Sequence, residues 1–140
     1  MVDALREARR VLTRRGVLID VRPVVAPIVV EVVIDAQAIW AVEVASFSAP
    51  EDTVAADAAV QQALSSGWFG FEKSIAFDFE IFCDTAAELR AYANARKLRG
   101  AEIPYVELEA RQRAMRGEGQ ALRLRCRRLW MLSTYGKDRF

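Results

Sequence analysis

Apolar and polar side chains alternate along the middle of the chain, over residues 68–83. Glu72, Ser74, Asp78 and Glu80 occupy one set of alternate positions. The opposite set is mostly apolar and contains Phe69, Phe71, Ile75, Phe77, Phe79 and Ile81. Because successive side chains of a strand point to opposite faces, this period predicts one long strand with its apolar face on the core.

Four shorter stretches are also typical of strands. Residues 16–21 form an apolar run directly after a helix-like segment, as in a strand that is buried on both faces. The β-branched runs 28–34 and 39–47 flank residues 35–38 and predict an antiparallel hairpin. A last strand is expected over 120–134, where the alternation slips at Arg127-Arg128 and predicts a β-bulge.

Apolar residues three or four positions apart recur between these strands and indicate amphipathic helices. The helices are expected at residues 2–14, 51–66, 84–98 and 104–116. Gly16, Gly67 and Gly117 follow three of them, as glycine often does at a helix end, and Ser48-Ala-Pro-Glu51 has the form of a capping box. The chain is thus expected to be a single α/β domain over residues 1–140. Its sheet would be central, mostly antiparallel and of about five strands, with helices packed on it.

The composition is that of a globular domain and excludes several kinds of chemistry. Of the 140 residues, 53% are apolar and 28% are charged, which is enough for a buried core. We see no membrane-spanning run and no signal-peptide pattern, so we expect a cytoplasmic protein. Histidine is absent, which excludes imidazole bases, histidine-activated nucleophiles and most zinc sites. Cys83 and Cys126 are expected as buried thiols, and no metal site is predicted.

The net charge of +1 conceals blocks of opposite sign. Residues 23–83 contain nine acids and one lysine, whereas residues 84–140 contain thirteen basic residues and seven acids. Such blocks are expected to attract each other within the fold or across a dimer, and a nearly neutral chain does not predict a nucleic-acid partner. If strand 120–134 pairs with strand 68–82, its arginines can face Glu72, Asp78 and Glu80.

Two segments resemble a known family. Residues 4–20 read Ala-Leu-Arg-Glu-Ala-Arg-Arg-Val-Leu-Thr-Arg-Arg-Gly-Val-Leu-Ile-Asp. This segment is similar to the helix and fifth strand of class I S-adenosylmethionine-dependent methyltransferases, although only Gly16 remains of the family's Pro-Gly-Gly-like turn. Residues 84–92 resemble the helix after the family's sixth strand, and the arginine-rich strand would be the seventh. The resemblance covers most of the chain but only the C-terminal half of the family's fold.

The resemblance implies both a strand order and a missing cofactor site. The last strand would lie between strand 16–21 and strand 68–82. In the family, S-adenosylmethionine binds at a glycine-rich loop on the first strands, and no such loop is found here. Gly117-Glu-Gly119 stands between a helix and a strand, which is the wrong order for a nucleotide cradle. We therefore expect no cofactor in this chain and no methyl transfer by the chain alone.

Four charged residues are candidates for a ligand site. Asp20 and Arg22 fall at the carboxyl end of strand 16–21, the edge where open α/β sheets bind ligands. Glu31 and Glu43 fall on facing strands of the hairpin, where two carboxylates can share a proton or act as acid and base. The simpler alternative for each pair is an ion pair with a nearby arginine or an exposed, solvated face.

Tryptophans and arginines give weaker candidates. Trp40 and Trp68, together with Trp130, can line an apolar pocket, but packing in the core or in a dimer interface explains them equally well. The arginines of strand 120–134 can bind phosphate, or they can pair with the acidic strand.

These features favour a methyltransferase-like domain that lacks its own cofactor site. We expect it to work as a homodimeric interaction or binding module, or as a partner subunit of another chain. A small apolar molecule is a further candidate ligand. The exposed apolar edge expected at strand 16–21 is the reason to expect a second copy. One alternative is an isomerase- or cyclase-like enzyme with Glu31, Glu43 or Asp78 as its base, which a deep cavity around a carboxylate of raised pKa would favour. Another is a truncated product of a full methyltransferase, which a glycine-rich segment encoded in frame just upstream would reveal.

Overall fold

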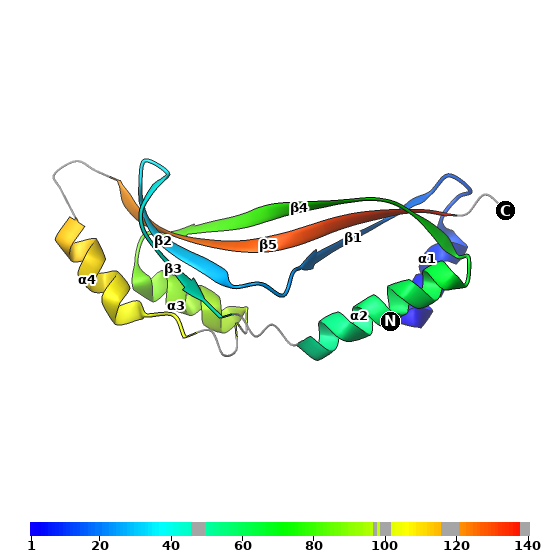
Figure 1. Cartoon of the computed structure of the whole chain (residues 1–140), viewed down its shortest axis with the longest axis horizontal. Coiled ribbons are helices and arrows are strands. Elements are labelled where there is room, and N and C mark those ends of the chain that lie inside the picture. Colours follow the sequence, from blue (N-terminus) through cyan, green and yellow to red (C-terminus); the bar gives the residue numbers. More distant parts are fainter. Residues whose placement is uncertain (46–49, 97, 99–101, 116–120, 138–140) are drawn as a thin grey trace. The chain divides into compact units, whose positions relative to one another are not determined.

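A computed structural model describes residues 1–45, 50–96, 98, 102–115 and 121–137 (Figure 1). Its elements are α1 (Val2–Val11), β1 (Val17–Pro23), β2 (Ile28–Ile34), β3 (Gln37–Val44), α2 (Pro50–Ser65), β4 (Phe69–Cys83), α3 (Ala86–Ala95), α4 (Tyr105–Met115) and β5 (Leu122–Lys137). The five strands form one antiparallel sheet, so the predicted architecture of about five strands with helices is confirmed. Residues 48 and 49 of the predicted capping box and the glycines at 117 and 119 lie outside the described residues, so that cap stays a prediction.

Strand β5 organises the sheet because it pairs with three others. Its pairing with β1 runs from Val17↔Gly136 to Pro23↔Trp130, and its pairing with β2 runs from Val29↔Arg127 to Ile34↔Leu122. β4 also pairs with β5. The last strand therefore neighbours both the first strand and the phenylalanine-rich strand. The slip in the β5 alternation falls where its partner changes from β2 to β1, and a bulge within β5 stays a prediction.

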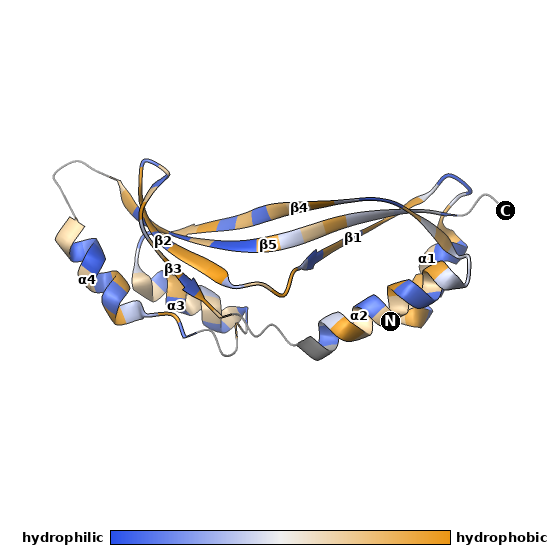
Figure 2. Cartoon of the chain, viewed as in Figure 1, coloured by the Kyte–Doolittle hydropathy of each residue, from blue (hydrophilic) through white to orange (hydrophobic). Residues whose placement is uncertain are grey.

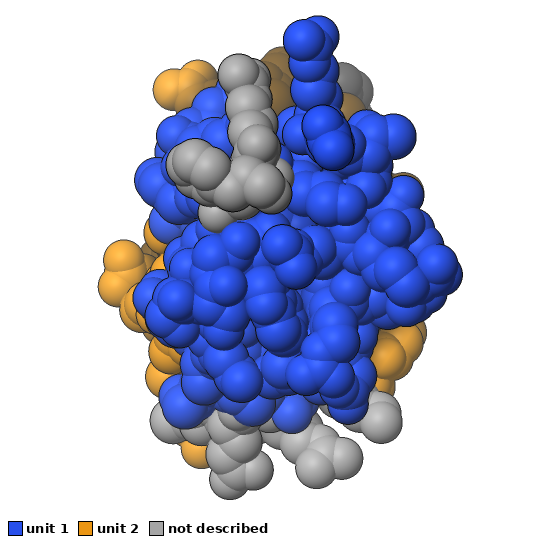
Figure 3. Space-filling view, turned by 90° about the vertical axis from the view of Figure 1, so that its right-hand side faces the viewer, with its two compact units in different colours: residues 1–23, 49–77, 130–140 blue, residues 24–48, 78–129 orange. Residues whose placement is uncertain are grey.

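The chain divides into two compact units (Figure 3). Unit 1 contains residues 1–23, 49–77 and 130–140, and unit 2 contains residues 24–48 and 78–129. The long strands β4 and β5 contribute residues to both units.

Unit 2 is built on the β2–β3 hairpin. The register from Ile28↔Val44 to Ile34↔Gln37 contains an irregularity between Val32 and Val33. Asp35 and Ala36 form the turn, and their φ angles of 49° and 67° are those of the left-handed region. The predicted hairpin is confirmed, but its turn has two residues instead of four because β3 already begins at Gln37.

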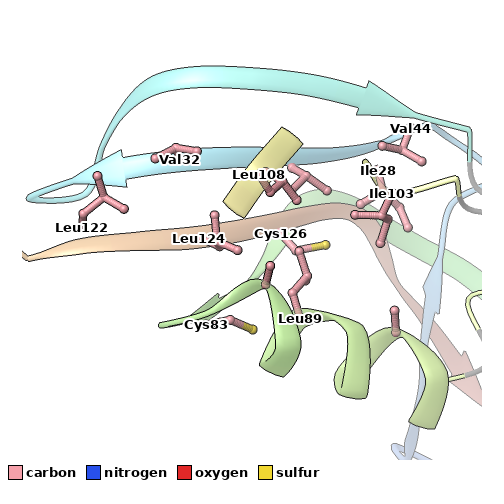
Figure 4. Packing of buried hydrophobic residues seen from close by; sticks show 13 residues of the cluster. Ile28, Val32, Val44, Cys83, Leu89, Ile103, Leu108, Leu122, Leu124 and Cys126 are labelled. Atoms are coloured by element: carbon pink, nitrogen blue, oxygen red, sulfur yellow. The ribbon is translucent and has the colours of Figure 1, made fainter. Parts of the chain in front are cut away.

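The core of unit 2 lies between this hairpin, β5 and the helices α3 and α4 (Figure 4). Val30 and Val32 of β2, Leu124 of β5, Leu89 of α3 and Leu108 of α4 are fully buried. The apolar face of α3 is placed by an N-terminal cap: Thr85 Oγ1 accepts a hydrogen bond from the Glu88 backbone N–H at 3.1 Å, and the Glu88 carboxylate accepts one from the Asp84 N–H at 2.8 Å. The predicted helix is therefore confirmed as α3 with Thr85 as its N-cap, but it ends at Ala95 and not at residue 98.

The smaller core of unit 1 joins α1 and α2 to the sheet. Ala63 of α2, Phe69 of β4 and Tyr135 of β5 are buried together, with Leu5 and Leu18 packed against them. α1 ends at Val11, earlier than the predicted residue 14. A Cβ on Gly16 would stand 2.9 Å from Leu12 atoms, so glycine is needed there for close packing of the turn.

Two burial predictions for unit 1 are wrong. β1 was expected to be buried on both faces, but Val17, Ile19 and Val21 are exposed because α1 and α2 pack only on the Leu18 side. The apolar row of β4 was expected to lie on the core, but all residues from 71 to 80 are exposed. Helices cover the two ends of β4, where Phe69 and Cys83 are buried, and leave its middle open.

Candidate functional site

The most buried charged side chain of the described residues is Glu31, on β2 in unit 2. It is 3% exposed. Arg125 Nε donates to Glu31 Oε2 at 2.6 Å, and Arg127 Nη2 donates to Glu31 Oε1 at 3.1 Å. Glu31 stands opposite Arg125 in the β2–β5 register, so the pairing of the strands itself brings these charges together. Arg125 also donates to the carbonyl of the turn residue Ala36 at 3.3 Å.

β4 adds two carboxylates to this cluster. Arg127 Nη1 lies 3.0 Å from Asp78 Oδ2, and Arg125 Nη1 lies 3.6 Å from Glu80 Oε1. The predicted pairing of the arginine row with the acidic strand is therefore confirmed for Asp78 and Glu80. It is not found for Glu72, whose carboxylate lies against Gly136.

The electrostatics of Glu31 favour its charged form. Burial alone would raise the pKa of Glu31, but the hydrogen bonds from Arg125 and Arg127 outweigh it and the pKa is lowered. A general base of a carboxylate enzyme needs the opposite shift, toward neutral pH. Glu43 lies on the same face, but it stands opposite Val29 and is exposed, so it does not form a dyad with Glu31.

Asp20 and Arg22 form a second ion-pair cluster, in unit 1. Arg22 Nε donates to Asp20 Oδ2 at 2.8 Å, and Arg22 Nη1 donates to Asp57 of α2 at 2.7 Å. Burial alone would lower the pKa of Arg22, but the hydrogen bonds with Asp20 and Asp57 raise it. The cluster thus fastens α2 to β1. Asp57 was not predicted as a partner because it lies 35 positions from Arg22 along the chain.

The two candidate tryptophans each lie beneath an arginine. The guanidinium of Arg111 is 4.5 Å from the ring centroid of Trp40, and that of Arg6 is 5.4 Å from the ring centroid of Trp68. Both rings are half-buried and pack against the cores of their own units. Each ring contributes to the packing of its own unit and has an arginine over its face.

Unit 1 has two hollows that differ in size and lining. The first has a volume of about 10 Å³ and is lined by apolar side chains, which leaves too little room for a ligand. The second has about 430 Å³ and is lined by Arg6, Glu7, Arg9, Arg10 and Lys137. Its charges are largely engaged: Arg6 pairs with Asp3, Arg10 with Glu7, and Lys137 donates to the Leu12 carbonyl. Neither hollow contains Glu31, Glu43 or Asp78.

Apolar side chains remain exposed on two strands of unit 1. On β1 they are Val17, Ile19 and Val21, with Ile19 59% exposed. On β4 they are Phe71, Ile75 and Phe77, which we call the β4 apolar row; Phe71 is 58% exposed and Ile75 53%. Figure 2 shows the alternation of apolar and polar positions along β4.

Within the part of the chain that the structure describes, no helix has the length and apolar character needed to cross a membrane. The described residues also contain no group of three or more carboxylates or thiols placed to hold a metal ion.

Comparison with family models, with curated proteins and with solved structures finds no match for this chain.

Proposed function

We propose that this chain is a non-catalytic, methyltransferase-like association module whose partner is a second copy of itself. The observation that carries the proposal is the β4 apolar row, where Phe71 and Ile75 are more than half exposed on a 15-residue strand. Full burial of an exposed side chain of this kind yields about 1.5–3 kcal/mol, so these side chains, which are 37–58% exposed, can each contribute roughly half of that and offset part of the cost of association.

The charged clusters support a non-catalytic role. Glu31 and Asp20 are engaged with arginines at 2.6–3.1 Å, and the pKa of Glu31 is lowered. A carboxylate held in its charged form by two arginines is a poor general base. The isomerase- or cyclase-like alternative required a raised pKa in a cavity, and no observation favours it.

Two features support the methyltransferase-like part of the proposal. The first is the sequence of the Ala4–Asp20 segment. The second is the pairing of β5 with both β1 and β4, which is the strand order that the resemblance implies. Calorimetric titration of the chain with S-adenosylmethionine tests it. We expect no heat of binding at micromolar concentrations, and micromolar binding would overturn the non-catalytic proposal.

Sedimentation velocity over a dilution series tests the association. We expect a dimer at micromolar concentration, and we expect Phe71→Asp to weaken it at least tenfold because a charge would be buried without a partner. The matched control is Val106→Asp, which places the same charge at a 79% exposed position of α4 in unit 2 and should leave the dimer intact. A wild-type monomer at all concentrations, or equal effects of the two substitutions, would overturn the proposal.

A further inference from the structure

We infer that the second copy joins through the free edge of β4, by antiparallel pairing of β4 with itself about a two-fold axis near Ser74. The inference deepens the proposed function and rests on it. Within the described residues β4 pairs with β5 alone, so one edge of this 15-residue strand has no strand beside it. Unpaired backbone groups along a strand edge are a template for another strand.

The sequence of β4 lacks most of the features that protect an edge strand. Natural edges carry proline, bulges, inward-pointing charges or very short strands. From Phe71 to Cys83 there is no proline and no glycine, and Lys73 is the only lysine. Side chains on both faces of β4 are exposed over residues 71–80, so an added strand would lie beside side chains of both faces. The protection that the strand does have is its charges, Glu72, Lys73, Asp78 and Glu80, and these restrict the register in which a partner can pair.

The charges of β4 select the register of such a pair. In an antiparallel pair the residues directly opposite lie on the same face, and like charges there are destabilising. A two-fold axis at Ser74 places Phe71 opposite Phe77, Glu72 opposite Ala76 and Lys73 opposite Ile75 of the other copy. No like charges oppose each other in this register, and two phenylalanine pairs form.

Neighbouring registers are worse. An axis at Lys73 places this lysine opposite itself. An axis at Ile75 places Glu72 opposite Asp78, and an axis at Ala76 places Glu72 opposite Glu80. An axis at Phe77 also avoids like charges, but within Phe71–Phe77 its single phenylalanine pair is Phe77 with itself, and its other contacts use residues 78–83 of unit 2. With the axis at Ser74, the central pairs, from Phe71 to Phe77, lie within unit 1.

Cysteine crosslinking tests this register. Ser74→Cys should form an intermolecular disulfide under mild oxidation, because its two copies would stand directly opposite, within the Cα separation that a disulfide spans. Glu72→Cys and Ala76→Cys should each fail to crosslink alone and should crosslink when mixed. The wild-type chain is the control, since Cys83 and Cys126 are buried.

The outcomes separate this inference from the proposed function. A dimer in sedimentation that crosslinks at neither Ser74 nor the 72/76 mixture would overturn the β4 register and leave the association standing. Crosslinking of Ala76→Cys alone would move the axis to Ala76 and would also overturn it. A chain that stays monomeric would overturn both.

Discussion

Replacing Glu31 by glutamine should destabilise the fold more than its conservative size suggests. Glutamine keeps the shape and one acceptor oxygen, but it leaves Arg125 and Arg127 without the carboxylate that each contacts at 2.6–3.1 Å. Removing one partner of a buried ion pair costs about 3–5 kcal/mol. Asp78 and Glu80 still lie 3.0 and 3.6 Å from the two arginines, so part of the compensation remains and we expect a loss of about 2–3 kcal/mol.

Urea denaturation at neutral pH measures this loss. With a slope of about 2 kcal/mol/M, a loss of this size lowers the unfolding midpoint by about 1 M or slightly more. Glu43→Gln is the matched control because Glu43 lies on the same face of the hairpin and is exposed. Its effect should stay within about 0.5 kcal/mol. Equal midpoints for the two variants would refute the view that Glu31 is the centre of the charge cluster.

The same comparison has a pH dependence of defined sign. The folded-state pKa of Glu31 is lowered by its arginines, so its stabilisation is complete above the unfolded pKa of about 4.3 and is lost as pH falls through the folded value. The difference between wild type and Glu31→Gln should therefore be largest at neutral pH and shrink under acid conditions. A difference that grows as pH falls would contradict the assignment.

Three further predictions concern the remaining structure. Ala36→Gly should stabilise the chain by about 1 kcal/mol in urea denaturation, because Ala36 has a φ of 67° that costs a non-glycine residue about that much; a destabilised variant would contradict this. Leu89→Ala should cost about 2–5 kcal/mol because Leu89 is fully buried, whereas Val106→Ala at an exposed position should cost less than about 0.5, and thermal unfolding compares them. Burial raises the pKa of Cys126 to about 11, so its thiol should resist alkylation at pH 8 until the chain is unfolded, and fast labelling of the native protein would show that the thiol is accessible.

Local patterns predicted the elements well because their signals are local. The helix expected over residues 51–66 appears as α2 (Pro50–Ser65), with Ala56 and Ala63 buried and Val60 packed against the core of unit 1. The β-branched runs 28–34 and 39–47 correctly predicted the β2–β3 hairpin. Its short turn was missed because Asp35 and Ala36 are not the Asn-Gly or Asp-Gly pair that the left-handed region favours.

Burial was predicted poorly where it depends on distant elements. The period of β4 shows which side chains share a face but not how far the helices extend along it. Phe69 and Cys83 are covered, whereas Phe71 and Ile75 between them are exposed. In the same way, the apolar run of β1 predicts a strand that is buried on both faces, but helices cover only the face that contains Leu18. Asp57 could not be predicted as a partner of Arg22, because only the packing of α2 brings them within 2.7 Å.

The charge blocks were the most informative feature of the composition, because the fold uses them internally. Arginines of the basic block meet acids of the acidic block in unit 2, through Arg125, Arg127, Glu31, Asp78 and Glu80. Charges that neutralise each other within one unit are not available to attract a charged ligand. Outside this cluster, large apolar side chains remain exposed on β1 and β4. Since apolar contact and backbone pairing are what an exposed strand offers, association by β4 follows from the same sequence period that first predicted the strand.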